Sequence, residues 1–188
     1  MLSLLESFDK LKALPLARHL IIKNEGDLNK IEFPYWLKAD ISEHKLELGA
    51  VVKCNNLSQA KENLKEMRKK FPASSIIAQE QIEGIEMIIG LKQDKAFGKL
   101  LLVGFGGTFA ETIKDTSFRA LPISNKEIEK QISELKLCKV LVSRKKFAID
   151  KFISLAEKIS KLDINEADFN PIILNEKGAF IVDARIEV

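Results

Sequence analysis

This sequence has few cysteines and histidines, and it has no large excess of either charge. Its two cysteines, Cys54 and Cys138, lack metal-binding spacing, which argues against a disulfide framework or a zinc site and favours free thiols in a reducing cytosol. The 30 basic and 27 acidic residues are interspersed and leave a net charge of +3, so neither a nucleic-acid nor a membrane partner is indicated. The longest apolar run, near residues 100–110, is too short to cross a bilayer. No secretory signal pattern is visible, so we expect a cytoplasmic protein.

The residues that are present suffice for a packed core. Hydrophobic residues make up 46% and charged residues 30% of the 188-residue chain, as in soluble globular proteins. Helical periodicity and strand-like runs alternate, which predicts an α+β fold of two sheet-and-helix lobes. We expect a single domain over 1–188, with a seam near Pro72 that separates lobes 1–72 and 73–188. Strands are expected at 19–23, 35–40, 49–54, 75–80, 85–93, 100–103 and 118–121, and helices over 2–14, over 57–71, after Ser124 and over 149–159.

The last residues of the chain are predicted to form a β-hairpin. Two strand-like runs, 168–174 and 179–186, flank the turn signal Asn-Glu-Lys-Gly. With a symmetric turn, Asn170 lies opposite Asp183 and Asp168 lies opposite Arg185. Cross-strand partners have Cβ atoms about 5 Å apart, so one ion could touch both Asn170 and Asp183. Their oxygen donors suit Mg²⁺, although an ordinary polar pair on a sheet face is the alternative.

A second group of polar residues suits phosphate chemistry. Lys38 sits in an apolar, aromatic strand, where burial would require an anionic partner such as a phosphate, unless the lysine lies on the wet face of an edge strand. His44 falls in a polar loop, where an imidazole can act as acid, base or nucleophile, or can simply be solvated. Lys45 beside it would raise the local positive potential and help to hold a phosphate.

Two further segments could approach a nucleotide. Gln79 and Gln81 end a hydrophobic strand, and Glu86 opens the next one after a turn at Gly84, so this hinge could contact a base and a ribose. The alternative is a plain β-turn with solvated acids. The run Gly104-Phe-Gly-Gly107 breaks a strong strand, and its glycines let backbone N–H groups approach an anion, although it is neither a Walker sequence nor GxGxxG.

Taken in order, these pieces resemble an ATP-grasp domain. The chain is most similar to the small β subunit of ADP-forming acetyl-CoA (acyl-CoA) synthetases, relatives of the succinyl-CoA synthetase β chains. The His-Lys stretch and the closing hairpin carry the specific part of this resemblance. The matching stretches are 36–51, 78–86, 94–98, 104–119, 168–173 and 182–186.

The resemblance implies a role for each matched residue. Lys38 matches the lysine that holds the nucleotide phosphates. His44 matches the histidine that the family uses as a phosphoryl carrier, and Asp168 matches an acidic residue near the phosphorylated histidine. The remaining matches concern the nucleotide and its metal: Gln79 and Gln81 around adenine and ribose, Glu86 near the ribose, and Asn170 and Asp183 as Mg²⁺ ligands.

The resemblance also implies an activity and a partner. The family interconverts acyl-CoA, ADP and phosphate with acid, CoA and ATP through a phosphohistidine relay. A CoA-binding α subunit is implied as partner, in a heterotetramer, with ATP or ADP as substrate and Mg²⁺ as cofactor. Two alternatives stay open. A different ATP-grasp enzyme, a carboxylate–amine ligase, would not need His44, and a non-catalytic nucleotide-binding subunit would tolerate loss of Lys38, Asn170 or Asp183.

Overall fold

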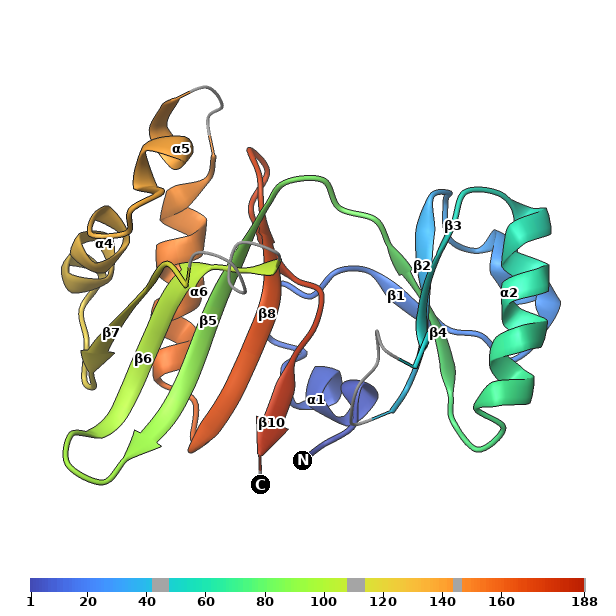
Figure 1. The fold of residues 1–188 in the computed structure, drawn as a ribbon, viewed down its shortest axis with the longest axis horizontal. Coiled ribbons are helices and arrows are strands. Elements are labelled where there is room, and N and C mark those ends of the chain that lie inside the picture. The colour runs from blue at the N-terminus through green and yellow to red at the C-terminus, as the bar shows by residue number, and fades with distance from the viewer. Residues whose placement is uncertain (42–47, 108–113, 144–146, 188) are drawn as a thin grey trace. The chain divides into compact units, whose positions relative to one another are not determined.

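Two antiparallel sheets organise the chain (Figure 1). The computed structural model describes residues 1–41, 48–107, 114–143 and 147–187. It divides into two compact units, a smaller one of residues 3–6 and 17–82 and a larger one of residues 1–2, 7–16 and 83–188. Helix α1, Leu4–Lys10, contributes residues to both. Among the described residues, no helix is long and apolar enough to cross a membrane.

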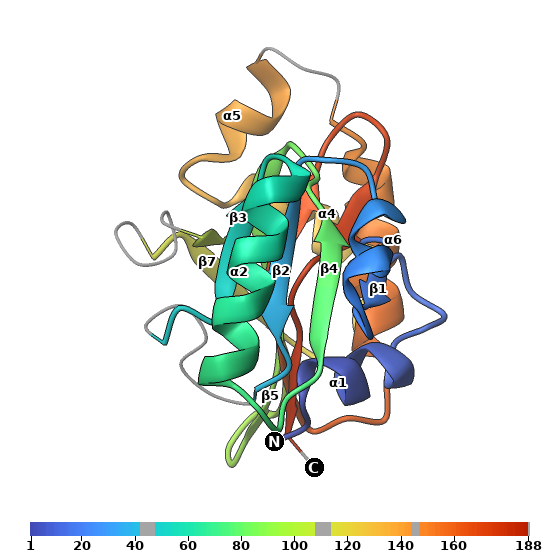
Figure 2. The ribbon, with the colours of Figure 1, turned by 90° about the vertical axis from the view of Figure 1, so that its right-hand side faces the viewer.

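The smaller unit is a four-stranded antiparallel sheet covered by one long helix. Its strands are β1 (His19–Ile21), β2 (Tyr35–Ala39), β3 (Val51–Cys54) and β4 (Ile76–Glu80), in the order β1-β4-β2-β3. Helix α2, Leu57–Lys70, packs on one face, as Figure 2 shows, and buries Ala60, Leu64 and Met67. Its N-terminus is capped by Asn56, whose side chain accepts a hydrogen bond from the Gln59 N–H. A short 3₁₀ helix, η1 (Glu25–Asn29), completes the unit.

The boundary between the units falls after β4, between Ile82 and Glu83, and not near Pro72 where the sequence suggested a seam. The reason is topological. Strand β4 pairs with both β1 and β2, so it is an interior strand of the first sheet. A proline ahead of an interior strand marks a loop within the unit and does not separate two units.

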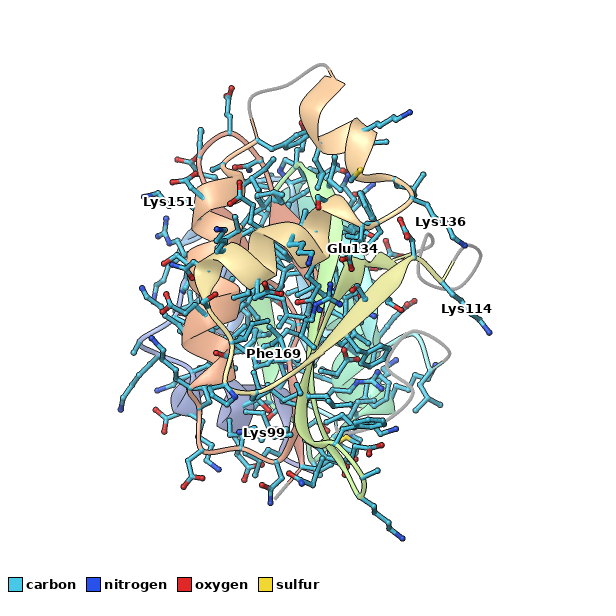
Figure 3. All side chains as sticks on the ribbon, turned by 90° about the vertical axis from the view of Figure 1, so that its left-hand side faces the viewer. Lys99, Lys114, Glu134, Lys136, Lys151 and Phe169 are labelled. Atoms are coloured by element: carbon cyan, nitrogen blue, oxygen red, sulfur yellow. The ribbon has the colours of Figure 1, made fainter. Side chains whose placement is uncertain are left out.

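The larger unit is a six-stranded sheet with helices on one face. Strands β5 (Ile85–Asp94), β6 (Gly98–Phe105), β7 (Thr116–Ala120), β8 (Glu166–Leu174) and β10 (Arg185–Glu187) run in the order β10-β8-β5-β6-β7, and β9 (Ala179–Ile181) pairs with β8. The helices are α4 (Asn125–Ser133), α5 (Cys138–Ser143) and α6 (Ile149–Ser160). Figure 3 views the sheet from the side that α4 and α6 cover, where Phe169 is fully buried.

Local sequence signals account for most of these elements. The helix expected after Ser124 is confirmed, and the Ser124 hydroxyl accepts a hydrogen bond from the Glu127 N–H. Two expectations differ from the structure. The helix expected over 2–14 ends at Lys10, and the six-residue helix α5 was not predicted, because it is too short for a hydrophobic period to stand out.

The closing hairpin has the predicted register. Leu174 pairs with Ala179 beside the turn, and Asp168 pairs with Arg185 at the far end. The returning strand, expected to be continuous over 179–186, is divided into β9 and β10 with an interruption at 182–184.

Candidate functional site

The exposed face of the larger sheet carries the polar residues of the hairpin. Along β8, Ala167 and Phe169 are buried toward the helices, so Asp168 and Asn170, which alternate with them, point to the other face. Because Asp168 pairs with Arg185, these two side chains share that face. The sheet therefore presents one carboxylate, one guanidinium and one carboxamide on a surface that α4 and α6 leave uncovered.

A row of cross-strand partners continues this surface across the sheet. Asp168 pairs with Gly90, Gly90 with Leu102, and Leu102 with Phe118. Gly90 has no side chain, and Leu102 is half-buried, so the row passes from the charged pair at the β10 edge to an apolar strip on β6 and β7. The row therefore joins the charged pair to apolar side chains on the same face of the sheet.

Asn170 stands at an irregularity of the sheet. The register between β5 and β8 shifts between Met87 and Ile89, so β8 carries an extra residue beside Asn170. Such bulges redirect side chains and are frequent beside functional sites. Because Ile172 pairs with Ile181 on one side and Asp168 with Arg185 on the other, Asn170 lies opposite the interruption that contains Asp183.

The charge of Asp183 affects the pKa of Asp168 in this hairpin. Burial raises the pKa of the Asp168 carboxyl above its ordinary value, Arg185 lowers it, and the charge of Asp183 raises it further. The influence of Asp183 on Asp168 indicates that the two carboxyl groups are near neighbours. The Oδ1 atom of Asp183 also accepts a hydrogen bond from the Ala184 N–H at 3.0 Å.

The donor set of the hairpin fits a hard divalent cation. Among the described residues, no three His, Cys, Asp or Glu side chains are grouped to hold a metal. The side-chain oxygens of Asn170 and Asp183 would supply two protein ligands. Mg²⁺ commonly takes few protein ligands and completes its shell with water and phosphate oxygens, so this sparse set suits it better than a cation that needs a full protein cage.

The smaller unit contributes a different set of predicted residues. Lys38 and Gln79 both lie on the sheet face opposite α2, because Lys38 pairs with Ile77, two residues before Gln79 on β4. Lys38 is 8% exposed and lies on the interior strand β2, which excludes the wet edge-strand alternative. The structure therefore places a cationic side chain on the face of this sheet that α2 does not cover.

The predicted hinge glutamines have unsatisfied polar atoms. Gln79 is 1% exposed, yet its Nε2 has no hydrogen-bond partner among the residues that the structure describes, and the buried Oε1 of Gln81 lacks one among them too. A buried amide left unpaired costs about 1–3 kcal/mol, so native proteins seldom retain such groups without a reason. One donor and one acceptor, two residues apart on the chain, fit the polar edge of a heterocyclic base.

Glu86 is found beside the glycine run that follows β6. Its Oε2 occupies the space that a β-carbon on Gly107 would take, and its backbone carbonyl accepts a hydrogen bond from the Gly106 N–H at 2.8 Å. Sequence reasoning proposed anion contacts for these glycines and missed their contact with Glu86. The sequence signal for this contact was the pair of adjacent glycines directly after a strand, where another segment can approach the backbone closely. His44 and Lys45 lie outside the described residues.

Comparison with known proteins identifies the class of this fold and site. Residues 24–188 match the family model of the ATP-grasp domain. The match covers most of the chain, which therefore belongs to the ATP-grasp domain family. The two-sheet, mixed helix-and-strand architecture expected from the sequence is confirmed by this match.

Particular relatives are acyl-CoA ligases. ADP-forming acetate–CoA ligase II of Archaeoglobus fulgidus is 32% identical over 169 residues, which cover 85% of this chain and 25% of that protein. The β subunit of ADP-forming acetate–CoA ligase I of Pyrococcus furiosus is 28% identical over 200 residues, which cover 94% of this chain and 86% of that subunit. This chain thus spans a quarter of the length of the first relative and most of the length of the second.

A solved structure shares the whole fold. It is the Ca. Korarchaeum cryptofilum dinucleotide forming acetyl-coenzyme A synthetase 1 in complex with coenzyme A and Mg-AMPPCP, with its phosphohistidine segment pointing towards the nucleotide binding site. The TM-score is 0.84 at 28% sequence identity, and the match covers 99% of this chain and 92% of that chain.

Proposed function

We propose that this chain is the ATP-grasp β subunit of an ADP-forming acyl-CoA synthetase. It interconverts acyl-CoA, ADP and phosphate with acid, CoA and ATP through a phosphohistidine relay. The observation that carries this proposal is the hairpin register, which sets Asn170 opposite Asp183 beside the partly buried Asp168, on a fold shared with acetate–CoA ligase β subunits.

The nucleotide-binding roles follow from the chemistry of each side chain. Lys38 holds phosphate oxygens, because a cationic side chain on the open face of an interior strand attracts anionic groups. Gln79 and Gln81 bind the base edge with the amide atoms that lack partners. Glu86 contacts the ribose.

The metal and the phosphoryl group are handled by the remaining residues. Asn170 and Asp183 hold Mg²⁺, which neutralises charge on the phosphate oxygens when it is bound. His44 accepts the phosphoryl group, and Lys45 adds positive potential beside it. Asp168, a half-buried carboxyl whose pKa is raised by burial, acts beside the phosphorylated histidine.

A partner subunit is part of this proposal. One relative is named a β subunit, and the Korarchaeum enzyme is described with coenzyme A and a phosphohistidine segment. We infer that a separate CoA-binding α subunit supplies the acyl and CoA sites, in a heterotetramer. The phosphate then passes from a histidine of that subunit to His44 and on to ADP.

Phosphoryl labelling tests the relay. The chain is incubated with a CoA-binding partner, Mg²⁺ and γ-labelled ATP, and the protein is examined for acid-labile, alkali-stable label. We expect label on the wild type and its loss, together with turnover, in His44→Ala. Unchanged label and turnover in the variant would reject the relay and favour the carboxylate–amine ligase.

Metal binding is tested separately with a matched pair of acidic residues. Asp183→Ala is expected to weaken binding of Mg-ADP strongly, because it removes a charged oxygen ligand. Glu83→Ala is expected to be nearly neutral, since Glu83 is exposed and its backbone carbonyl, which alanine keeps, accepts the bond from Asn175 Nδ2. Calorimetric titration with Mg-ADP measures both, and equal affinities would contradict the metal assignment.

A further inference from the structure

The pair Gly106–Gly107 is enclosed by two side chains of the proposed site. A β-carbon on Gly106 would lie 2.9 Å from Asn170 Oδ1 and 2.7 Å from the Met87 carbonyl oxygen. A β-carbon on Gly107 would coincide with Glu86 Oε2. A larger residue at either position would collide with the side chain of Asn170 on β8 or of Glu86 on β5, so both positions require glycine.

Hydrogen bonds hold this pair in place. The Gly106 N–H donates to the Glu86 carbonyl oxygen at 2.8 Å, and the Gly107 N–H donates to Asn170 Oδ1 at 3.3 Å. Gly107 has a φ of 57°, in the left-handed region that favours glycine. The chain thus turns sharply at the end of β6 and directs one N–H group at the Asn170 side chain.

The bond to Asn170 has a consequence for metal binding. A carboxamide can present either its oxygen or its NH₂ group, and only the oxygen ligates a cation. An N–H donor at 3.3 Å is compatible with the oxygen and not with the NH₂ group, so Gly107 selects the orientation that a metal needs. A carbonyl oxygen has two lone pairs, so Oδ1 can accept this bond and still ligate.

Glu86 supports the same orientation from the other side. Its carboxylate oxygen lies against Gly107, in the space that a β-carbon would take. This contact restricts the position of Gly107 and therefore of the N–H group that Asn170 accepts. Glu86 therefore contacts Gly107, whose N–H group donates to the proposed metal ligand Asn170, in addition to the ribose contact proposed above.

We propose that Gly107 is a positioning residue of the metal site, which orients the Asn170 carboxamide through its N–H group and is itself seated by the Glu86 carboxylate. The inference rests on the proposed function, because it requires Asn170 to be a Mg²⁺ ligand. Groups that orient metal ligands typically change metal affinity by about 10–100-fold when they are removed.

The test compares Gly107, two residues beyond the end of β6, with Gly98, the first residue of β6. Gly107→Ala places a methyl group on the Glu86 carboxylate, whereas Gly98→Ala places one at a φ of 73° with nothing within 4 Å. Both variants carry the backbone strain of a left-handed alanine, and only the first disturbs the proposed site. Calorimetric binding of ADP is measured against Mg²⁺ concentration and again in excess chelator.

We expect Gly107→Ala to raise the Mg²⁺ concentration for half-maximal ADP binding by about tenfold or more, with Gly98→Ala close to wild type. In excess chelator, the affinity of Gly107→Ala for ADP should fall by less than its Mg²⁺ requirement rises, and Gly98→Ala should change little. Equal Mg²⁺ dependence in Gly107→Ala and Gly98→Ala would overturn the inference.

A third variant covers the case in which Gly107→Ala does not fold. Glu86→Ala keeps the glycine and removes its seat, so a rise in the Mg²⁺ requirement that exceeds any loss of ADP affinity in chelator supports the inference. Loss of ADP affinity alone would overturn it. Wild-type protein that binds ADP independently of Mg²⁺ would instead contradict the proposed metal site itself, and this inference with it.

Discussion

The buried carboxylate of Asp115 is expected to stabilise the larger unit more than any exposed carboxylate with the same bonds. Asp115 is 4% exposed, and its two oxygens accept hydrogen bonds from the Lys136 and Leu137 N–H groups, each at 2.8 Å. These bonds fasten the start of β7 to the segment that leads into α5. Figure 3 labels Lys136, one of the two donors, and Lys114, the residue before Asp115.

The expected magnitude comes from the two bonds and their burial. Each hydrogen bond to a charged group contributes about 1.5–3 kcal/mol, and Asp115→Ala would leave both N–H groups without this acceptor. The free energy of unfolding should therefore fall by about 3–6 kcal/mol, a large part of the 5–15 kcal/mol that is typical of a domain.

Asp94 provides the matched control. Its Oδ1 accepts bonds from the Ala96 and Phe97 N–H groups at 2.8 and 2.9 Å, and these bonds lower the pKa of its carboxyl. They lie at an exposed hairpin turn, where water can replace the carboxylate. Asp94→Ala should therefore cost only a small fraction of the loss in Asp115→Ala.

Urea denaturation followed by circular dichroism measures both variants. The single tryptophan, Trp36, lies on β2 and reports separately on the smaller unit by fluorescence. Comparable losses of stability in Asp94→Ala and Asp115→Ala would refute the reasoning, because burial would then not decide the strength of these bonds.

Three further outcomes are expected. Gly84→Ala should lower the melting temperature more than Gly90→Ala. A methyl group on Gly84 would meet a backbone carbonyl oxygen at 2.5 Å, a conflict worth about 1–3 kcal/mol, whereas the nearest atom to a methyl group on Gly90 is at 3.4 Å. The reverse order in calorimetric melting would be inconsistent with this packing. The side-chain bond from Lys30 lowers the pKa of Asp27 from 3.8 to about 2. The stabilising contribution of the Asp27 carboxylate is therefore present above pH 3.8 and is lost as the pH falls toward 2. Asp27→Asn should flatten the acid limb of a stability–pH curve, and an unchanged limb would exclude this role. Lys38→Met should weaken ADP binding about tenfold or more, measured by calorimetry, and unaltered affinity would remove Lys38 from the phosphate site.

Much of the site could be predicted because its signals are local. The hairpin register depends on an even turn and two short runs, and the pairing of Asp168 with Arg185 follows from counting residues away from that turn. Lys38 is conspicuous because a charge inside an apolar aromatic strand is costly to bury. The fold class and the family of the chain were also accessible from such patterns, and the comparisons confirm them.

Other features could not be predicted because they depend on contacts between distant segments. The assignment of β4 to the first unit depends on its pairing with β1 and β2. The contact of Gly107 with Asn170 joins residues 63 positions apart, and no local pattern encodes that proximity. The role of Asp115 also depends on backbone groups more than 20 residues away, at separations of 21 and 22.

The sequence alone determined which residue types face one another across the closing turn and which strand would have to bury a cation, because both follow from chain geometry within a few residues. Only the tertiary structure decided which atoms those side chains meet. Sheet pairing brings together segments whose separation along the chain carries no information about their distance in space, and the surroundings of Asn170, Glu86 and Asp115 are set by that pairing.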